Sequence, residues 1–127
     1  IEDAIYATKA ALKEGIVSGG GVALMDASAK ISAKAVGEEI LLKAIQAPFY
    51  TILDNAGIEY PDHTEQWGKE EGGGIDVVTG KEVDMIDSGI IDPVLVTKSA
   101  LKNAVSVVST IISADCVISN MRMNESN

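Results

Sequence analysis

The chain has 127 residues, of which 46% are hydrophobic and only 4% aromatic, and its formal net charge at pH 7 is −9. This length suits one domain or a piece of one, and a core of Ala, Val, Ile and Leu suits closely packed helices. The acidic balance argues against nucleic acid or an anionic membrane as the main partner, because both need clustered Lys and Arg. No stretch reaches the length of about 20 apolar residues that a membrane span requires.

Apolar residues in the first half of the chain recur at helical spacings of three and four. They predict an amphipathic helix from the first residue to Gly15, and a second helix opened by Gly19–Gly21. A third helix is predicted from about Val36 to Ala56. Pro48 should interrupt it near Gln46–Ala47, because proline removes a backbone hydrogen bond and crowds the preceding turn.

The second half of the chain changes character at Gly72–Gly74, which are predicted to break the chain. The following residues, IDVVTGKEV, predict a short β-hairpin with Thr79–Gly80 in its turn. Asp92 and Pro93 predict the start of the longest helix, with Asp92 as N-cap and proline in the first helical position. Its crowded apolar C-terminal half predicts burial on most sides. The alternation at Cys116–Met121 predicts a terminal edge strand that needs an outside partner.

The triple glycine Gly19–Gly21 stands directly before the second predicted helix. Glycine permits positive φ and carries no Cβ, and a helix N-terminus presents unpaired N–H groups, so a phosphate, a sugar or another chain can approach closely. A tight turn between helices explains the same residues without any ligand. The phosphate-binding pattern GxxxxGK[ST] is absent, because no lysine follows the glycines. Both interpretations stay open on this motif alone.

Side chains suited to catalysis are few. His63 lies on a polar segment and Cys116 on an apolar one, which gives little support to a nucleophilic triad or dyad, or to a zinc site. A single cysteine excludes an internal disulfide and favours a reducing compartment, the cytoplasm or an organelle matrix. Asp84, Asp87 and Asp92 stand close in sequence and could bind Mg²⁺ or act as acid and base. The alternative is a solvated loop for the first two and a helix cap for the third.

Three blocks, taken in order, resemble one protein family. They are IEDAIYATKAALKEGIVSGGGVALM, KAIQAPFYTILDNAG and GGGIDVVTGKEVDMIDSGIIDPVLVTKSALKNAVSVVSTIISADCVI. The chain resembles the C-terminal part of a group I chaperonin (GroEL family), from residue 1 to about residue 119. The resemblance implies that residues 1–127 are the C-terminal half of an equatorial domain, a fragment of a longer chain. The implied fold is mainly α, a helical bundle with a small hairpin and a terminal edge strand.

The resemblance also implies a role in binding ATP. The residues that it places around the nucleotide are Gly20, Asp76, Val77, Val78, Ile90 and Asp92. Gly20 would lie against the nucleotide, the three hairpin residues would contact the adenine, Ile90 would pack on the adenine, and Asp92 would accept hydrogen bonds from the ribose hydroxyls. The two valines stand where relatives usually carry alanines. The phosphate-binding loop, the Mg²⁺ ligands and the catalytic aspartates would lie outside this chain.

The expected function is therefore that of a part of an ATP-dependent protein-folding chaperonin. The resemblance implies a homo-oligomeric ring of subunits, with clients and co-chaperonin bound by domains outside this chain, and no nucleic acid or membrane partner. The fragment alone, with no catalytic or metal-binding residue, is expected to be inactive. One alternative is an assembly module that lost nucleotide binding through Val77 and Val78. Another is a small metal-dependent enzyme that uses the three aspartates.

Overall fold

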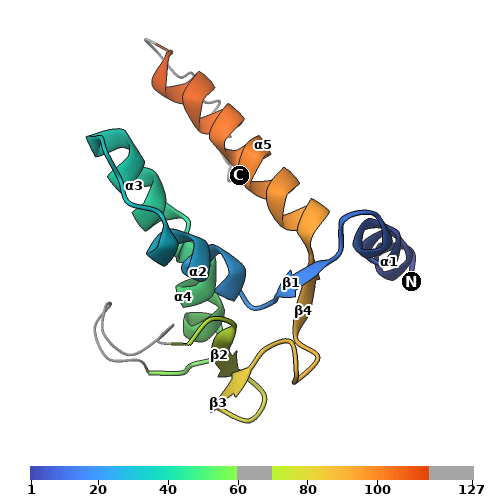
Figure 1. Cartoon of the computed structure of the whole chain (residues 1–127). Helices are drawn as coiled ribbons and strands as arrows, with labels where there is room; N and C mark the ends of the chain where they lie inside the picture. Colours follow the sequence, from blue (N-terminus) through green and yellow to red (C-terminus); the bar gives the residue numbers. More distant parts are fainter. Residues whose placement is uncertain (60–69, 115–127) are drawn as a thin grey trace, which may run out of the picture.

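The computed structural model describes residues 1–59 and 70–114 (Figure 1). The predictions for His63 and for the terminal strand Cys116–Met121 lie outside the described residues. The elements in chain order are α1 (Glu2–Glu14), β1 (Ile16–Ser18), α2 (Val22–Lys30), α3 (Val36–Ala44), α4 (Ala47–Asn55), β2 (Gly73–Asp76), β3 (Lys81–Asp84), β4 (Ile91–Pro93) and α5 (Val94–Ile112). Helices dominate, as the sequence predicts.

The helices of the first half begin and end at the predicted signals. Helix α1 ends at Gly15, whose φ is 87°, and α2 begins directly after Gly21, whose φ is 79°. The long predicted helix is divided into α3 and α4, with Gln46 as the N-cap of α4 and Pro48 in its first turn. Proline is tolerated there because the first turn has no internal partner for its missing N–H group.

Two antiparallel strand pairs complete the fold. Strands β2 and β3 form the predicted hairpin, in a register that runs from Gly73 opposite Asp84 to Asp76 opposite Lys81. The second pair was not predicted: β1 lies against β4 and sets Ser18 opposite Ile91. Each of its strands has three residues, which is too short to show a period of two in the sequence.

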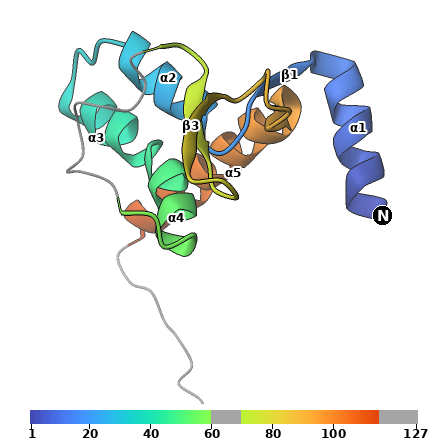
Figure 2. The same ribbon diagram turned by 90° about the horizontal axis from the view of Figure 1, so that it is seen from below.

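The hydrophobic core lies where α2, α4 and the hairpin meet. It consists of Val22, Phe49, Leu53, Ile75 and Met85, and Leu53 and Met85 are each only 1% exposed. Figure 2 shows α2, α4 and the hairpin gathered together, with α1 set apart at the other side of the molecule. The core therefore joins the helix that follows the triple glycine to the hairpin and to the turn after it.

The structure corrects the prediction that Gly72–Gly74 break the chain, since Gly73 and Gly74 lie inside β2. A Cβ on Gly74 would lie 2.5 Å from Cγ2 of Val22 and 2.8 Å from Sδ of Met85. The strand can approach the core this closely only without a side chain at this position. The glycine thus marks a close approach inside a strand and not a boundary.

The predicted start of the last helix is also wrong. Helix α5 begins at Val94, Pro93 is its extended N-cap residue, and no side chain caps it. Asp92 lies in β4, opposite Val17. The strand pairing holds residues 91–93 extended, and the N–H group of Val94 donates to the carbonyl oxygen of Gly15 at 3.1 Å. Asp92 is therefore a strand residue and not the helix cap.

The prediction that α5 is buried on most sides is not met among the described residues. No residue of α5 is buried, and Val107 and Ile112 are 59% and 78% exposed. The helix contacts α1 and β4, and Figure 1 shows it running away from the hairpin. By length and composition alone, its 19 residues also meet the requirement for a membrane span, contrary to the expectation from the sequence. Those criteria are weak, because helices covered by other protein segments meet them too.

Candidate functional site

The triple-glycine turn packs closely against three other parts of the protein. A Cβ on Gly19 would lie 3.0 Å from the carbonyl oxygen of Ile90, and one on Gly21 would lie 2.6 Å from the backbone nitrogen of Phe49. A Cβ on Gly20, whose φ is +65°, would lie 2.8 Å from Cε of Met85. Packing within the protein thus accounts for all three glycines, and the tight-turn interpretation has a complete physical basis.

The same turn lies directly against the segment 90–92. The N–H group of Gly19 donates to the carbonyl oxygen of Ile90 at 2.9 Å, which continues the pairing of β1 with β4. Ile90 is half-buried and packs against the core. Asp92 is exposed, and its carboxylate makes no hydrogen bond or ion pair within residues 1–59 and 70–114. Both oxygens of this carboxylate can therefore accept hydrogen bonds from a ligand.

Asp76 has a role inside its own hairpin. Its Oδ1 accepts a hydrogen bond from the N–H group of Val78 at 2.9 Å, and its Oδ2 accepts one from Oγ1 of Thr79 at 2.9 Å. These bonds, first the one from Val78, lower the pKa of the Asp76 carboxyl below its ordinary value. An aspartate side chain that bonds to the backbone two residues on is a known turn element, and Gly80 after Thr79 is the local turn signal in the sequence. The carboxylate stabilises the turn, and its expected contact with adenine stays a prediction.

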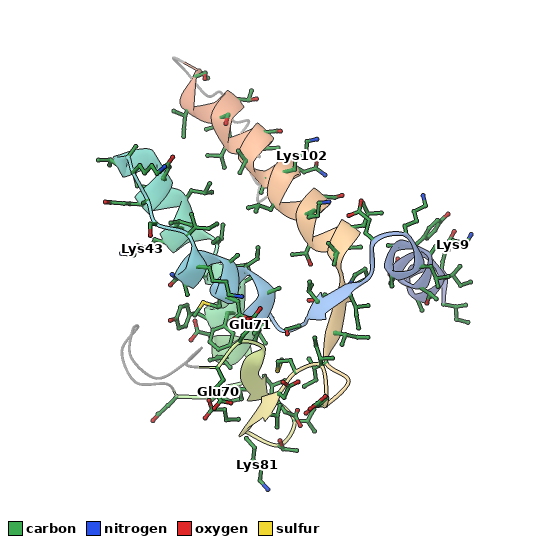
Figure 3. All side chains as sticks on the ribbon, viewed as in Figure 1. Lys9, Lys43, Glu70, Glu71, Lys81 and Lys102 are labelled. Carbon is green, nitrogen blue, oxygen red and sulfur yellow. The ribbon has the colours of Figure 1, made fainter. Side chains whose placement is uncertain are left out.

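Val77 and Val78 lie at the tip of the hairpin, beyond its last pair, Asp76 and Lys81. They are 40% and 90% exposed. Figure 3 shows Lys81 at the outer end of the hairpin, pointing away from the rest of the molecule. Gly74, by contrast, packs on α2 at the inner end of the same strand. The structure therefore brings Gly20 and Ile90 close to the core, while the hairpin tip lies at the outer end of β2.

The three aspartates of the second half do not form a metal centre. In the part of the chain that the structure describes, no group of three or more His, Cys, Asp or Glu side chains could hold a metal ion. Oδ1 of Asp84 accepts a hydrogen bond from the N–H group of Asp87 at 2.8 Å, which is a local turn contact. The interpretation as a metal-dependent enzyme thus has no geometric support from these residues.

A contact that sequence reasoning missed joins α2 to the hairpin. Oδ2 of Asp26 accepts a hydrogen bond from the N–H group of Gly72 at 3.0 Å. The residues are far apart in sequence, and an aspartate in the middle of a helix resembles any solvated helix position. No sequence signal distinguishes this carboxylate from its neighbours.

Comparison with known proteins places the chain in a family. The sequence profile of the TCP-1/cpn60 chaperonin family matches residues 1–122. The fold is similar to the crystal structure of a group III chaperonin in the open state, with a TM-score of 0.68 and 25% sequence identity. That match covers 86% of this chain and 25% of the other, so the chain spans about a quarter of the length of that relative. The chain belongs to the TCP-1/cpn60 chaperonin family.

Proposed function

We propose that the chain is the C-terminal half of the equatorial domain of an ATP-dependent protein-folding chaperonin, and that it supplies the adenine and ribose side of the nucleotide pocket. One observation carries the proposal. The triple-glycine turn and the segment 90–92, far apart in the sequence, lie in direct contact through the bond from Gly19 to Ile90 and the pairing of β1 with β4. The family resemblance implies that residues of both segments, Gly20, Ile90 and Asp92, contact the nucleotide.

The residues at this contact fit the adenosine part of ATP. Asp92 offers an exposed carboxylate without a partner among the described residues, and a carboxylate suits the two hydroxyls of a ribose. Ile90 offers partly exposed apolar surface to an adenine ring. Gly20 is half-buried, and because its missing Cβ would face Met85, it would present its backbone to a ligand at the turn. Bound ATP would supply the free energy for conformational change in the subunit.

The triphosphate and Mg²⁺ would be held elsewhere. The described residues contain no group of carboxylates, histidines or cysteines that could hold a metal ion. No lysine directly follows the triple glycine in the sequence. We therefore propose that the phosphate-binding loop and the Mg²⁺ ligands belong to other segments of the subunit, and that residues 1–127 alone do not hydrolyse ATP above background.

Exposed apolar side chains support the proposal that this chain is part of a larger assembly. They occur on three helices, and include Ile5, Leu12, Val36, Ile40, Val107 and Ile112, each at least 50% exposed. Large apolar patches on soluble proteins mark surfaces that other protein covers. We propose that the rest of the subunit and neighbouring subunits of a homo-oligomeric ring cover these helices, inside the cell and without a membrane. Clients and a co-chaperonin would bind to other domains.

We propose the group I type for the parent subunit. The three sequence blocks quoted above are in the order and spacing of that group. The solved relative belongs to group III at 25% identity, and it supports the fold without deciding the group. Counting the subunits of the purified ring by native mass spectrometry, next to a group I and a group III reference, tests this assignment.

A second candidate function is assembly without nucleotide binding. Two observations favour it: both oxygens of Asp76 are engaged within the hairpin turn, and Val78 at the tip is 90% exposed. Calorimetric titration of the full-length subunit with ATP separates the two candidates. Saturable binding supports the proposed nucleotide pocket. A subunit that assembles into rings yet releases no heat with ATP, and binds none at equilibrium dialysis, supports the assembly module.

A further inference from the structure

One face of α2 lies along the chain that leads into β2. Val22 and Asp26 are four residues apart on α2 and therefore share that face. Cγ2 of Val22 packs against Gly74, and a Cβ on this glycine would lie only 2.5 Å from it. Oδ2 of Asp26 accepts the hydrogen bond from the N–H group of Gly72. The segment 72–74 thus runs antiparallel to α2, held at one point by apolar packing and at the other by a carboxylate.

The next position on this face adds an ion pair, between Lys30 and Glu71. Figure 3 shows Glu71 beside α2. The two side chains are 57% and 74% exposed, and exposed pairs of this kind contribute little, because water screens them and their side-chain entropy opposes pairing. Asp26 is half-buried, so its bond is the stronger polar contact between α2 and this segment among the described residues.

Gly72 is the point at which several elements meet. It is buried, its φ is +82°, and its carbonyl oxygen accepts a hydrogen bond from the N–H group of Met85 at 3.0 Å. A Cβ on it would lie 3.4 Å from Oγ of Ser18 in β1. A buried N–H group that loses its acceptor is destabilising, so the chain would shift to bring Gly72 to water. Such a shift would also move Met85, which donates to Gly72 and lies against Gly20 in the turn that opens α2.

We propose that Asp26 is a positioning residue of the nucleotide pocket. Its carboxylate fixes the start of the hairpin against α2, the helix that begins at the triple glycine. Met85 donates its N–H group to Gly72, and its carbonyl oxygen accepts a hydrogen bond from the N–H group of Ile90 at 2.8 Å. A Cβ on Gly20 would lie 2.8 Å from Cε of the same methionine. Met85 thus joins the start of the hairpin to both walls of the proposed pocket, the triple-glycine turn and the segment 90–92, so this inference rests on the proposed function. The bond sets the separation of the two walls without contact between Asp26 and the nucleotide.

The test compares three variants of the full-length subunit by ATP titration and by hydrogen exchange of the segment 71–76 without nucleotide. Asp26→Ala removes the acceptor, and we expect the ATP dissociation constant to rise about three- to tenfold, the equivalent of one hydrogen bond, with faster exchange at Gly72. Asp26→Asn keeps an acceptor oxygen and should bind ATP within about twofold of the wild type. Lys30→Ala removes the exposed pair and should change neither quantity.

Several outcomes would overturn the inference. Faster exchange in Asp26→Ala with an unchanged ATP dissociation constant would show that Asp26 has a structural role only. A loss of affinity in Asp26→Asn equal to that in Asp26→Ala would show that the charge matters and the hydrogen bond to Gly72 does not. A wild-type subunit that binds no ATP would overturn the proposed function, and this inference with it, whereas binding by the wild type with an unaffected Asp26→Ala overturns the inference alone.

Discussion

The packing of Gly21 against α4 predicts a large and specific loss of stability on substitution. Gly21 has a φ of +79°, and a Cβ there would lie 2.6 Å from the nitrogen and 2.8 Å from Cα of Phe49. Gly80 is the matched control, because its φ is +69° and a Cβ there meets nothing within 4 Å. Both glycines have a left-handed backbone conformation, so an alanine at either position would be under similar conformational strain. Only Gly21→Ala also forces backbone atoms apart.

The magnitudes follow from these contacts. Left-handed backbone costs an alanine about 1 to 2 kcal/mol, and the lower entropy of the unfolded chain offsets about 0.4 to 1 kcal/mol of this. Gly80→Ala should therefore lower stability by roughly 0 to 1.6 kcal/mol. Overpacking against backbone adds about 1 to 3 kcal/mol, so Gly21→Ala should lower stability by about 1 to 4.6 kcal/mol.

Native-state hydrogen exchange of the full-length subunit measures this difference locally. The readout is the free energy of opening at amides of the core, such as those of Leu53 and Ile75, which are 1% and 5% exposed. Gly21→Ala should lower this opening free energy about 1 to 3 kcal/mol more than Gly80→Ala does. Equal effects of the two substitutions would refute the reasoning, because the close approach of Gly21 to Phe49 would then have no energetic consequence.

Three further outcomes are expected. Gly20→Val should lower both thermal stability and ATP affinity, because the φ of Gly20 is +65° and a Cβ there would lie 2.8 Å from Cε of Met85. A loss of ATP affinity with an unchanged melting temperature would contradict this packing. The folded-state pKa of Asp76 lies below its unfolded value, so the stability from its turn bonds is present above about pH 4 and is lost as the pH falls through the folded-state pKa. Asp76→Ala should therefore remove the acid dependence of hydrogen exchange in the hairpin. If that dependence persists in the variant, another group causes it. The side chains of the ion pair Lys98–Glu14 are 65% and 37% exposed, and exposed pairs contribute little to stability. Lys98→Ala should therefore change the free energy of unfolding, measured by denaturant titration, by no more than about 0.5 kcal/mol. A change several times larger would show that this pair is stronger than exposed pairs usually are.

The parts of the fold that local signals define could be predicted from the sequence. Helical spacing gave α1 and α2, Gly15 marked the end of α1, and Pro48 marked the division between α3 and α4. The hairpin followed from its β-branched residues and its Thr79–Gly80 turn. Each of these elements depends on residues within a few positions of one another, which is why the sequence alone defines them.

The parts that depend on contacts between distant segments could not be predicted. Asp92 followed by proline is a strong helix-cap signal, but the pairing of β4 with β1 holds Asp92 extended and moves the helix start to Val94. The apolar composition of α5 predicted burial, yet none of its residues is buried in the described part of the chain, because burial depends on neighbours that the local pattern does not identify. Of the candidate site, the contact of Gly19 with Ile90 and the bond from Gly72 to Asp26 join segments that no local pattern connects.

The strand position of Asp92 changes what its substitution should do. Because no side chain caps α5, Asp92→Ala should leave apo-state melting nearly unchanged, whereas a helix cap would lose about 0.5 to 2 kcal/mol. If its carboxylate binds the ribose, the same substitution weakens ATP binding about tenfold, which is the usual scale for a hydrogen bond to a charged group. Asp87→Ala, at an exposed aspartate in the turn before the segment 90–92, is the control and should bind ATP normally.

The most direct test of the nucleotide pocket pairs this variant with a changed ligand. Calorimetric titration of the full-length wild-type subunit should give a dissociation constant about tenfold higher for 2′,3′-dideoxy-ATP than for ATP, because the ribose hydroxyls that donate to Asp92 are missing. The Asp92→Ala subunit should bind both nucleotides equally, since each change removes the same interaction. If the wild-type subunit binds both nucleotides equally, or if the two losses add in full, Asp92 does not hold the ribose and the proposed site is wrong.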